Sequence, residues 1–188
     1  MSTGIPASLR PKIWLAFAGA SERLEANPEV FDELCSQLEV NVGGDTSDTA
    51  GGGAASQSSS SILGTEQQQA KRRVLEQIEK DLRRTEVGSD GGMLRRLRRV
   101  LSAYASHNPE VGYVQGMNFI AVALLRVLDE PQTFWMLVVI VERWLPDHFS
   151  HAMVGNHIDC RVLATLTSEH LPRLSMRLAE LDISVQLL

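Results

Sequence analysis

The sequence contains little cysteine and no long hydrophobic run. Its two cysteines, Cys35 and Cys160, form no CxxC pair, which argues against a disulfide framework or a cysteine zinc site and favours a reducing compartment. The most apolar stretches, at residues 119–125 and 134–141, are shorter than the roughly 20 residues of a membrane span. No apolar signal-peptide core follows Met1. We therefore expect a cytoplasmic protein whose apolar stretches are buried core helices.

Motifs of several chemical classes are also missing. No G-x-x-x-x-G-K-[ST] loop occurs, so we expect the chain to bind no nucleotide by itself, and no G-x-S-x-G elbow supports a hydrolase triad. One region groups histidines with an acidic residue and a cysteine, but without the H-x-x-x-H spacing of a metal site. We expect no metal there; the residues are His151, His157, Asp159, Cys160 and His170. Sustained apolar–polar alternation is absent too, and the helical spacing that prevails predicts an all-α, multi-helix fold.

The composition is that of an ordinary globular protein, with one unusual distribution of charge. The 188 residues are 44% hydrophobic and 22% charged, and the formal net charge is −5. Between residues 71 and 99, however, ten basic residues outnumber five acidic ones. Such a strip attracts phosphate or an acidic protein face, although solvated helix faces with ion pairs would have the same composition. Arg84 stands apart from the other arginines, because it lies where a helix gives way to a glycine-rich loop.

Small and polar residues dominate the segment 41–61. Such a composition cannot offset the entropy of ordering a chain, so this segment is predicted to be a disordered low-complexity insertion. The helix after it is predicted to open at a capping box formed by Thr65 and Gln68. Further along, an apolar helix is predicted from about residue 113 to residue 128.

Three short motifs occur in an order that resembles the TBC domain of Rab GTPase-activating proteins. They are R-x-x-x-W at residues 10–14, I-x-x-D-x-x-R at residues 78–84 and Y-x-Q-G-M at residues 113–117. The resemblance covers residues 4–188 and implies a multi-helix domain with an N-terminal lobe and the start of a C-terminal lobe. The later helices of the family, with their W-F motif, have no counterpart before Leu188. The resemblance therefore implies a partial, C-terminally truncated TBC domain that carries the insertion at residues 41–61.

The resemblance implies that the chain activates GTP hydrolysis by a partner. It places Arg84 in the role of an arginine finger and Gln115 in that of a glutamine finger, both supplied in trans. An arginine is always charged and forks onto phosphate oxygens, which suits the spread charge of the phosphoryl-transfer transition state. The implied partner is a GTP-bound Rab-family small GTPase, and GTP and Mg²⁺ belong to that partner rather than to this chain as cofactors.

Other matched residues are expected to support these two. Asp81 would hold the guanidinium between turnovers, Tyr113 would pack beside the finger loop, and Gly116 would permit close backbone approach. Asn118 would bond the adjacent loop, or it is only a helix-surface amide. Two further matched residues are expected to be architectural, with the indole in the core and the guanidinium bonded to a carbonyl or carboxylate: Trp14 and Arg10.

Two alternatives to an activator remain open at this stage. A helical module that binds a small GTPase or an adaptor without stimulating it would suit a domain whose C-terminal lobe is missing. A phosphate or nucleic-acid binder would use the LRRLRR run at residues 94–99. The activator is the leading hypothesis; it implies no substrate of its own, no nucleic-acid partner, a role in vesicle trafficking and peripheral recruitment to endomembranes through partners.

Overall fold

The computed structural model describes residues 4–43, 59–85, 91–150 and 152–184. Within these ranges every regular element is a helix, which confirms the all-α prediction. The chain divides into two compact units, Met1–Val139 and Ile140–Leu188. The helices of the first unit are, in chain order, η1 (Ala7–Leu9), α1 (Arg10–Ala18), α2 (Ala20–Ala26), α3 (Val30–Gly43), α4 (Ser59–Arg84), α5 (Gly91–His107), α6 (Met117–Leu125) and α7 (Glu130–Val139).

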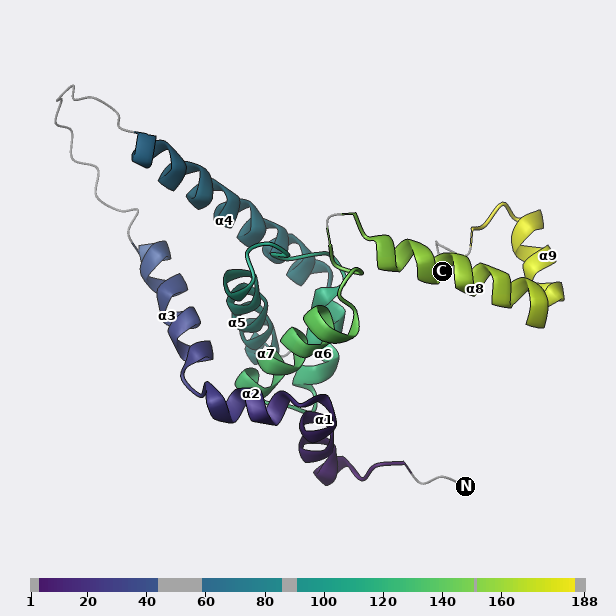
Figure 1. Ribbon diagram of the computed structural model, residues 1–188, viewed down its shortest axis with the longest axis horizontal. Coiled ribbons are helices and arrows are strands. Elements are labelled where there is room, and N and C mark those ends of the chain that lie inside the picture. The colour runs from purple at the N-terminus through teal and green to yellow at the C-terminus, as the bar shows by residue number, and fades with distance from the viewer. Residues whose placement is uncertain (1–3, 44–58, 86–90, 151, 185–188) are drawn as a thin grey trace. The chain divides into compact units, whose positions relative to one another are not determined.

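Helix α5 is the centre of the first unit. It packs against α3, α4, α6 and α7 (Figure 1). Its inward stripe consists of Leu97, Val100, Leu101 and Tyr104, each at most 1% exposed. These positions recur at three- and four-residue spacing, which places them on one face of a helix. The basic residues of α5 fall between them, so one helix provides both the core and part of the charged strip.

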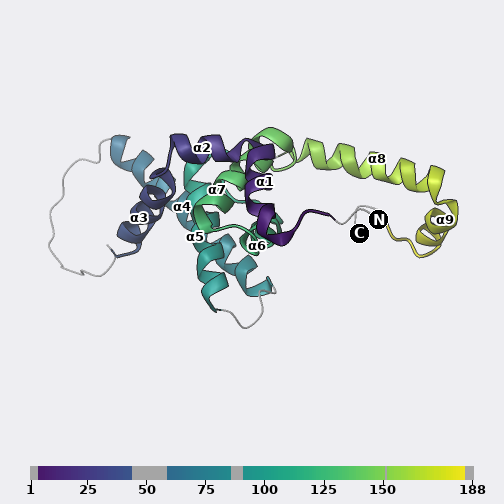
Figure 2. The same ribbon diagram turned by 90° about the horizontal axis from the view of Figure 1, so that it is seen from below.

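Helix α7 completes this core from the other side. It contacts α5 and α6, and α1 and α2 also pack on it (Figure 2). Phe134 is fully buried, and its ring lies 5.7 Å from that of Phe31, 5.3 Å from that of His107 and 5.0 Å from that of Trp135, measured between ring centroids. Tilted and edge-on aromatic pairs at these distances are favourable. The apolar stretch at residues 134–141 is therefore largely a buried core helix, as expected.

The ends of α3 and α4 differ from the sequence-based prediction. Helix α3 extends to Gly43 and α4 begins at Ser59, so Thr65 lies inside α4 and the predicted helix start at Thr65 is wrong. No proline lies between Ser59 and Thr65, so nothing in this stretch prevents the helix from beginning before Thr65. Residues 44–58, the middle of the predicted insertion, lie outside the described residues.

Helix α6 is shorter than the predicted apolar helix. It begins at Met117 because Gly116 has a φ of 104° and cannot belong to a right-handed helix. Gly112, with a φ of 63°, makes a second turn before it. The Y-x-Q-G-M motif therefore forms the turn that leads into α6, and the side chain of Gln115 is exposed there.

The second unit contains a short π-helical segment, η2 (Ile140–Trp144), followed by α8 (Val154–His170) and α9 (Pro172–Glu180). Helices α8 and α9 pack against each other. Leu171 lies between them in a non-helical conformation, with a φ of −131° and a ψ of 57°, and Pro172 begins α9 at a position where a missing N–H costs nothing. Within the described part of this unit, Leu178 and Thr167 are buried.

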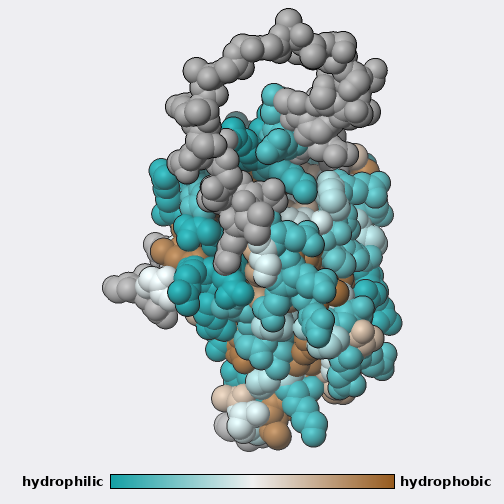
Figure 3. Space-filling model, turned by 90° about the vertical axis from the view of Figure 1, so that its left-hand side faces the viewer, coloured by the Kyte–Doolittle hydropathy of each residue, from teal (hydrophilic) through white to brown (hydrophobic). Residues whose placement is uncertain are grey.

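Surface composition agrees with the expectation of solvated helix faces. Hydrophilic residues dominate the face of the molecule drawn in Figure 3. Lys71, Arg72 and Arg73 of α4 are exposed. In the described ranges, no helix combines the length and the apolar character that crossing a membrane requires.

Candidate functional site

The candidate site lies where α4 ends. Arg84 is the last residue of this helix, and Thr85 closes its final turn by donating its backbone N–H to the carbonyl of Leu82 at 3.2 Å. A basic residue in the last turn is favoured by the helix dipole. The side chain of Arg84 is 61% exposed, whereas that of Asp81, one turn earlier, is 2% exposed. One helical turn thus presents an exposed guanidinium beside a buried carboxylate.

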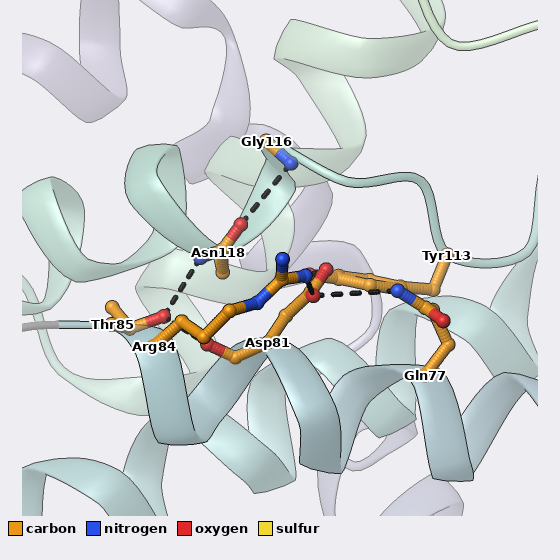
Figure 4. Close-up of polar contacts among 7 residues, drawn as sticks. All are labelled: Gln77, Asp81, Arg84, Thr85, Tyr113, Gly116 and Asn118. Atoms are coloured by element: carbon orange, nitrogen blue, oxygen red, sulfur yellow. Dashed lines mark hydrogen bonds and ion pairs between the residues drawn. The ribbon is translucent and has the colours of Figure 1, made fainter.

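Asp81 accepts hydrogen bonds from three side chains (Figure 4). Its Oδ1 pairs with Nη2 of Arg84 and accepts a second hydrogen bond from Nε2 of Gln77 at 3.3 Å. Its Oδ2 accepts a hydrogen bond from the hydroxyl of Tyr113 at 2.8 Å. A buried carboxylate needs such partners to offset its lost hydration. The geometry therefore brings three of the predicted site residues together, Asp81, Arg84 and Tyr113, with Asp81 at the centre.

The electrostatics of this cluster keep Asp81 ionised and Tyr113 protonated. Burial alone would raise the pKa of the Asp81 carboxyl, but the hydrogen bonds from Arg84 and Tyr113 outweigh burial and hold the pKa below its ordinary value. Burial raises the pKa of the Tyr113 hydroxyl, and its hydrogen bond to Asp81 raises it further. At neutral pH the Asp81 carboxylate therefore accepts its three hydrogen bonds as an anion, and the Tyr113 hydroxyl is the donor in the bond that joins them.

A second network joins α4 to the turn before α6. The amide nitrogen of Asn118 donates to the Thr85 hydroxyl at 2.7 Å, and that hydroxyl donates to the Asp81 carbonyl at 2.6 Å. The amide oxygen of Asn118 accepts from the backbone N–H of Gly116 at 3.1 Å. Asn118 is only 2% exposed, so it is a buried bridge and not a helix-surface amide. It ties the end of α4 to the turn that carries Gln115.

Gln115 itself is held by the backbone alone. Its side chain is exposed, in contrast to the two buried residues that begin α6 directly after this turn, Met117 and Asn118. The φ of 104° at Gly116 sets the direction in which the turn leaves Gln115, and any other residue at that position would be strained. The two candidate fingers, Arg84 and Gln115, are thus both exposed and are linked through the Thr85–Asn118–Gly116 network.

An open pocket of about 370 Å³ lies beside Arg84. Its lining comes from the end of α4 and from one face of α6, and consists of Arg84, Thr85, Phe119, Val122, Ala123 and Arg126. Phe119 is 62% exposed although most residues of α6 are buried. The lining of the pocket thus combines two guanidinium groups with three apolar side chains.

Most arginines of the LRRLRR run have internal partners. Nη2 of Arg96 donates to the carbonyl of Leu128 at 3.0 Å, Nη2 of Arg98 donates to Oε2 of Glu79 at 2.9 Å, and Nη1 of Arg99 lies 3.1 Å from Oε2 of Glu130. These contacts join α5 to its neighbours. The arrangement favours helix-packing roles for this run over a surface for phosphate or nucleic acid.

The N-terminal motif lies at the start of the first unit. Nε of Arg10 donates to the carbonyl of Ile5 at 3.0 Å, which is the carbonyl contact expected for an architectural arginine. Trp14 lies on α1 and is only partly buried, so it borders the core and does not fill it. Both residues belong to the N-terminal part of the first unit.

The proposed absence of a metal site concerns residues of the second unit. Nε2 of His148 lies 2.7 Å from Oδ2 of Asp159, a single pair. Among the residues that the structure describes, no three histidine, cysteine or acidic side chains are grouped so that they could hold a metal ion. His151 lies outside those residues.

Sequence reasoning missed Gln77, Thr85 and the four other residues that line the pocket. Gln77 precedes Asp81 by four residues, a spacing at which helical side chains meet, and this signal could have identified it. Thr85 directly follows the motif arginine, but its contact with Asn118 is tertiary. Phe119 and Arg126 join the pocket only because α6 begins at Met117, and that boundary depends on the conformation of Gly116.

The Asp81 network predicts a pH dependence of stability. Because the folded state lowers the pKa of Asp81, this group stabilises the fold above its unfolded pKa of about 3.9 and loses that contribution as the pH falls further. Asp81→Asn should therefore flatten the decline of unfolding free energy between about pH 5 and pH 2. At neutral pH it should cost about 1–3 kcal/mol, because the new amide nitrogen faces donors.

Urea denaturation at several pH values measures this difference. Glu79 has a lowered pKa as well, caused first by the hydrogen bond from Arg98, so part of the pH dependence should remain in the variant. Equal slopes of unfolding free energy against pH in both proteins would show that Asp81 is not held as described.

Comparisons with known proteins agree with the resemblance of the motifs. The family model described as the Rab-GTPase-TBC domain matches residues 7–188. Small G protein signaling modulator 3 of Bos taurus is 34% identical over 192 residues, and that of Homo sapiens is 34% identical over 194 residues. Both alignments cover 98% of this chain and 22% of the relative. The chain therefore spans about a fifth of the length of these curated relatives.

Two solved structures share the fold. The crystal structure of the Chlamydomonas flagellar RabGAP TBC domain matches with a TM-score of 0.68 and 26% identity, over 98% of this chain and 54% of that one. The Ypt/Rab-GAP domain of Gyp1p matches with a TM-score of 0.59 and 19% identity, over 97% of this chain and 61% of that one. At 19% identity the second likeness concerns the fold alone.

Proposed function

The chain belongs to the Rab-GTPase-TBC domain family, and on this premise we propose that it stimulates GTP hydrolysis by a Rab-family small GTPase. The observation that carries the proposal is the exposed Arg84 side chain held against the buried Asp81 carboxylate at the end of α4. In this proposal the chain is an activator without a substrate of its own. GTP and Mg²⁺ belong to the partner, and the chain needs no cofactor.

The chemistry assigned to Arg84 is stabilisation of charge. Phosphoryl transfer from GTP to water has a loose transition state, in which negative charge spreads over the γ-phosphoryl and leaving-group oxygens. A guanidinium stays protonated and donates two parallel hydrogen bonds to such oxygens. Supplied by an activator, an arginine of this kind increases the rate by about 10³–10⁵-fold.

Asp81 positions that arginine between encounters. Its hydrogen bonds from Tyr113 and Gln77 remain available when Arg84 turns toward a phosphate. The carboxylate is therefore not left unpaired at that moment, which would otherwise oppose the movement. Arg84 also loses less side-chain entropy on binding, because its ion pair with Asp81 already restricts it.

In this proposal Gln115 orients the water molecule that attacks the γ-phosphate. A neutral amide both accepts and donates hydrogen bonds, so it can orient a water molecule without changing its own protonation. The exposed turn before α6 offers this side chain to a partner, and the Asn118 bridge keeps the turn at a constant position relative to Thr85 and the end of α4.

A panel of purified Rab GTPases loaded with GTP tests the proposal. Phosphate release is followed with and without catalytic amounts of the 188-residue chain, and binding to each GTP-loaded GTPase is measured in parallel. We expect multiple-turnover stimulation of at least one member. Binding without stimulation across the panel would contradict the proposal in favour of a non-catalytic binding module, and absence of both would contradict any role in this GTPase class.

A further inference from the structure

We infer that the pocket beside Arg84 is the docking site for an acidic, apolar-tipped segment of the GTP-bound GTPase. One bulky apolar side chain of the partner packs on Phe119 and Val122, and one carboxylate pairs with Arg126. This inference rests on the proposed function and deepens it, because it assigns partner binding to residues that the motifs do not include.

The position of the pocket is the first argument. Arg84 is itself one of its lining residues, so a GTPase that brings its phosphate to Arg84 also covers the space beside it. The other lining residues besides Thr85 lie on α6 or directly after its end: Phe119, Val122, Ala123 and Arg126. These positions are spaced by three and four residues, so they form one continuous stripe along the helix.

The exposure of Phe119 is the second argument. This ring is 62% exposed, while Val122, one turn further along the same face, is 7% exposed. A large aromatic side chain at the rim of an apolar pocket is typical of a residue that becomes buried on association. Covering it with an apolar partner side chain removes apolar surface from water, which favours the complex.

Charge is the third argument and defines the chemistry of the partner. The lining of the pocket includes two arginines, Arg84 and Arg126, and no acidic residue. Asp81 already neutralises Arg84 in part. In the described part of the chain Arg126 belongs to no ion pair, in contrast to Arg96, Arg98 and Arg99. An opposite charge on the partner therefore complements Arg126 without breaking an internal contact.

Steady-state kinetics with the GTPase that the wild-type chain stimulates most test this inference. We expect Phe119→Ala and Arg126→Glu each to raise the GTPase concentration for half-maximal stimulation by about 10-fold, with the maximal rate per activator nearly unchanged. Phe119→Leu and Arg126→Lys should recover most of the affinity. Ala123→Glu, which removes no contact and places a negative charge in the pocket, should weaken binding similarly.

The chain provides matched controls. Phe17 is 88% exposed on α1, and Arg23 is exposed on α2; neither lines the pocket. Phe17→Ala and Arg23→Glu should leave both kinetic constants at the wild-type values. Thermal unfolding of all variants is measured alongside, and Ala123→Glu keeps the test valid if truncation of Phe119 lowers stability.

The outcomes separate this inference from the proposed function. Stimulation by the wild-type chain with unchanged half-saturation in the Phe119, Arg126 and Ala123 variants would overturn the docking site and leave the proposed function in place. A maximal rate that falls at constant half-saturation would likewise overturn it, since those residues would then act on catalysis. If the wild-type chain neither binds nor stimulates any GTPase of the panel, the proposed function itself fails.

Discussion

Arg84→Ala is expected to lower the maximal rate of stimulated GTP hydrolysis by about 10³-fold or more. The physical reason is that the variant removes the guanidinium that would neutralise charge on the transferring phosphoryl group, while the pocket lined by α6 remains. Half-saturation by the GTPase should change much less than the maximal rate. Single-turnover phosphate release at saturating activator measures the effect directly.

Arg84→Lys is the informative control for this variant. It retains the positive charge and loses the planar fork, so recovery of only a small part of the rate would show that geometry matters as well as charge. Gln115→Ala removes the proposed water-orienting amide and leaves the contacts of Asp81 intact. A rate within about threefold of wild type for Arg84→Ala would contradict the arginine-finger assignment, which requires a far larger loss.

Phe134→Ala should reduce the free energy of unfolding by about 3–5 kcal/mol. Phe134 is fully buried between α3, α5 and the rest of α7, where its ring contacts those of Phe31, His107 and Trp135. Truncation leaves a cavity that the surrounding helices cannot close, because each of them packs on a second neighbour. A domain typically has only 5–15 kcal/mol of stability, so this one change removes a large share.

Denaturant unfolding followed by circular dichroism checks the Phe134 prediction. Phe17→Ala is the matched control, since the same truncation at an 88% exposed site should change stability by less than about 0.5 kcal/mol. Similar losses in both variants would contradict the described core, and so would a loss below about 1 kcal/mol at Phe134.

Local patterns in the sequence were sufficient for the fold class and for part of the candidate site. Three- and four-residue spacing of apolar residues predicted an all-α fold, and Leu97, Leu101 and Tyr104 of α5 show this spacing on a buried face, because helical periodicity is a property of neighbouring residues. The I-x-x-D-x-x-R spacing also predicted that Asp81 and Arg84 would meet, since residues three apart share a helix face. These contacts depend on one helix alone.

Contacts between separate helices could not be obtained in this way. The bond from Tyr113 to Asp81 and that from Asn118 to Thr85 join residues far apart in the chain, and they form only after α4, α5 and α6 have packed together. The same packing leaves Asn118 buried and Phe119, its direct neighbour, 62% exposed. A polar residue is thus buried and its apolar neighbour exposed, the reverse of what their identities alone would predict, because packing sets the surroundings of each.

Helix boundaries also differ from what local sequence signals predict. A capping box at Thr65 and an apolar run at residues 113–128 are local signals, yet α4 begins at Ser59 and α6 at Met117. The sequence alone indicates the helical character, the basic strip and the two candidate finger residues. Packing determines which side of each helix remains open to a partner, because exposure is a property of the assembled core and cannot be assigned to a residue before its neighbours are in place.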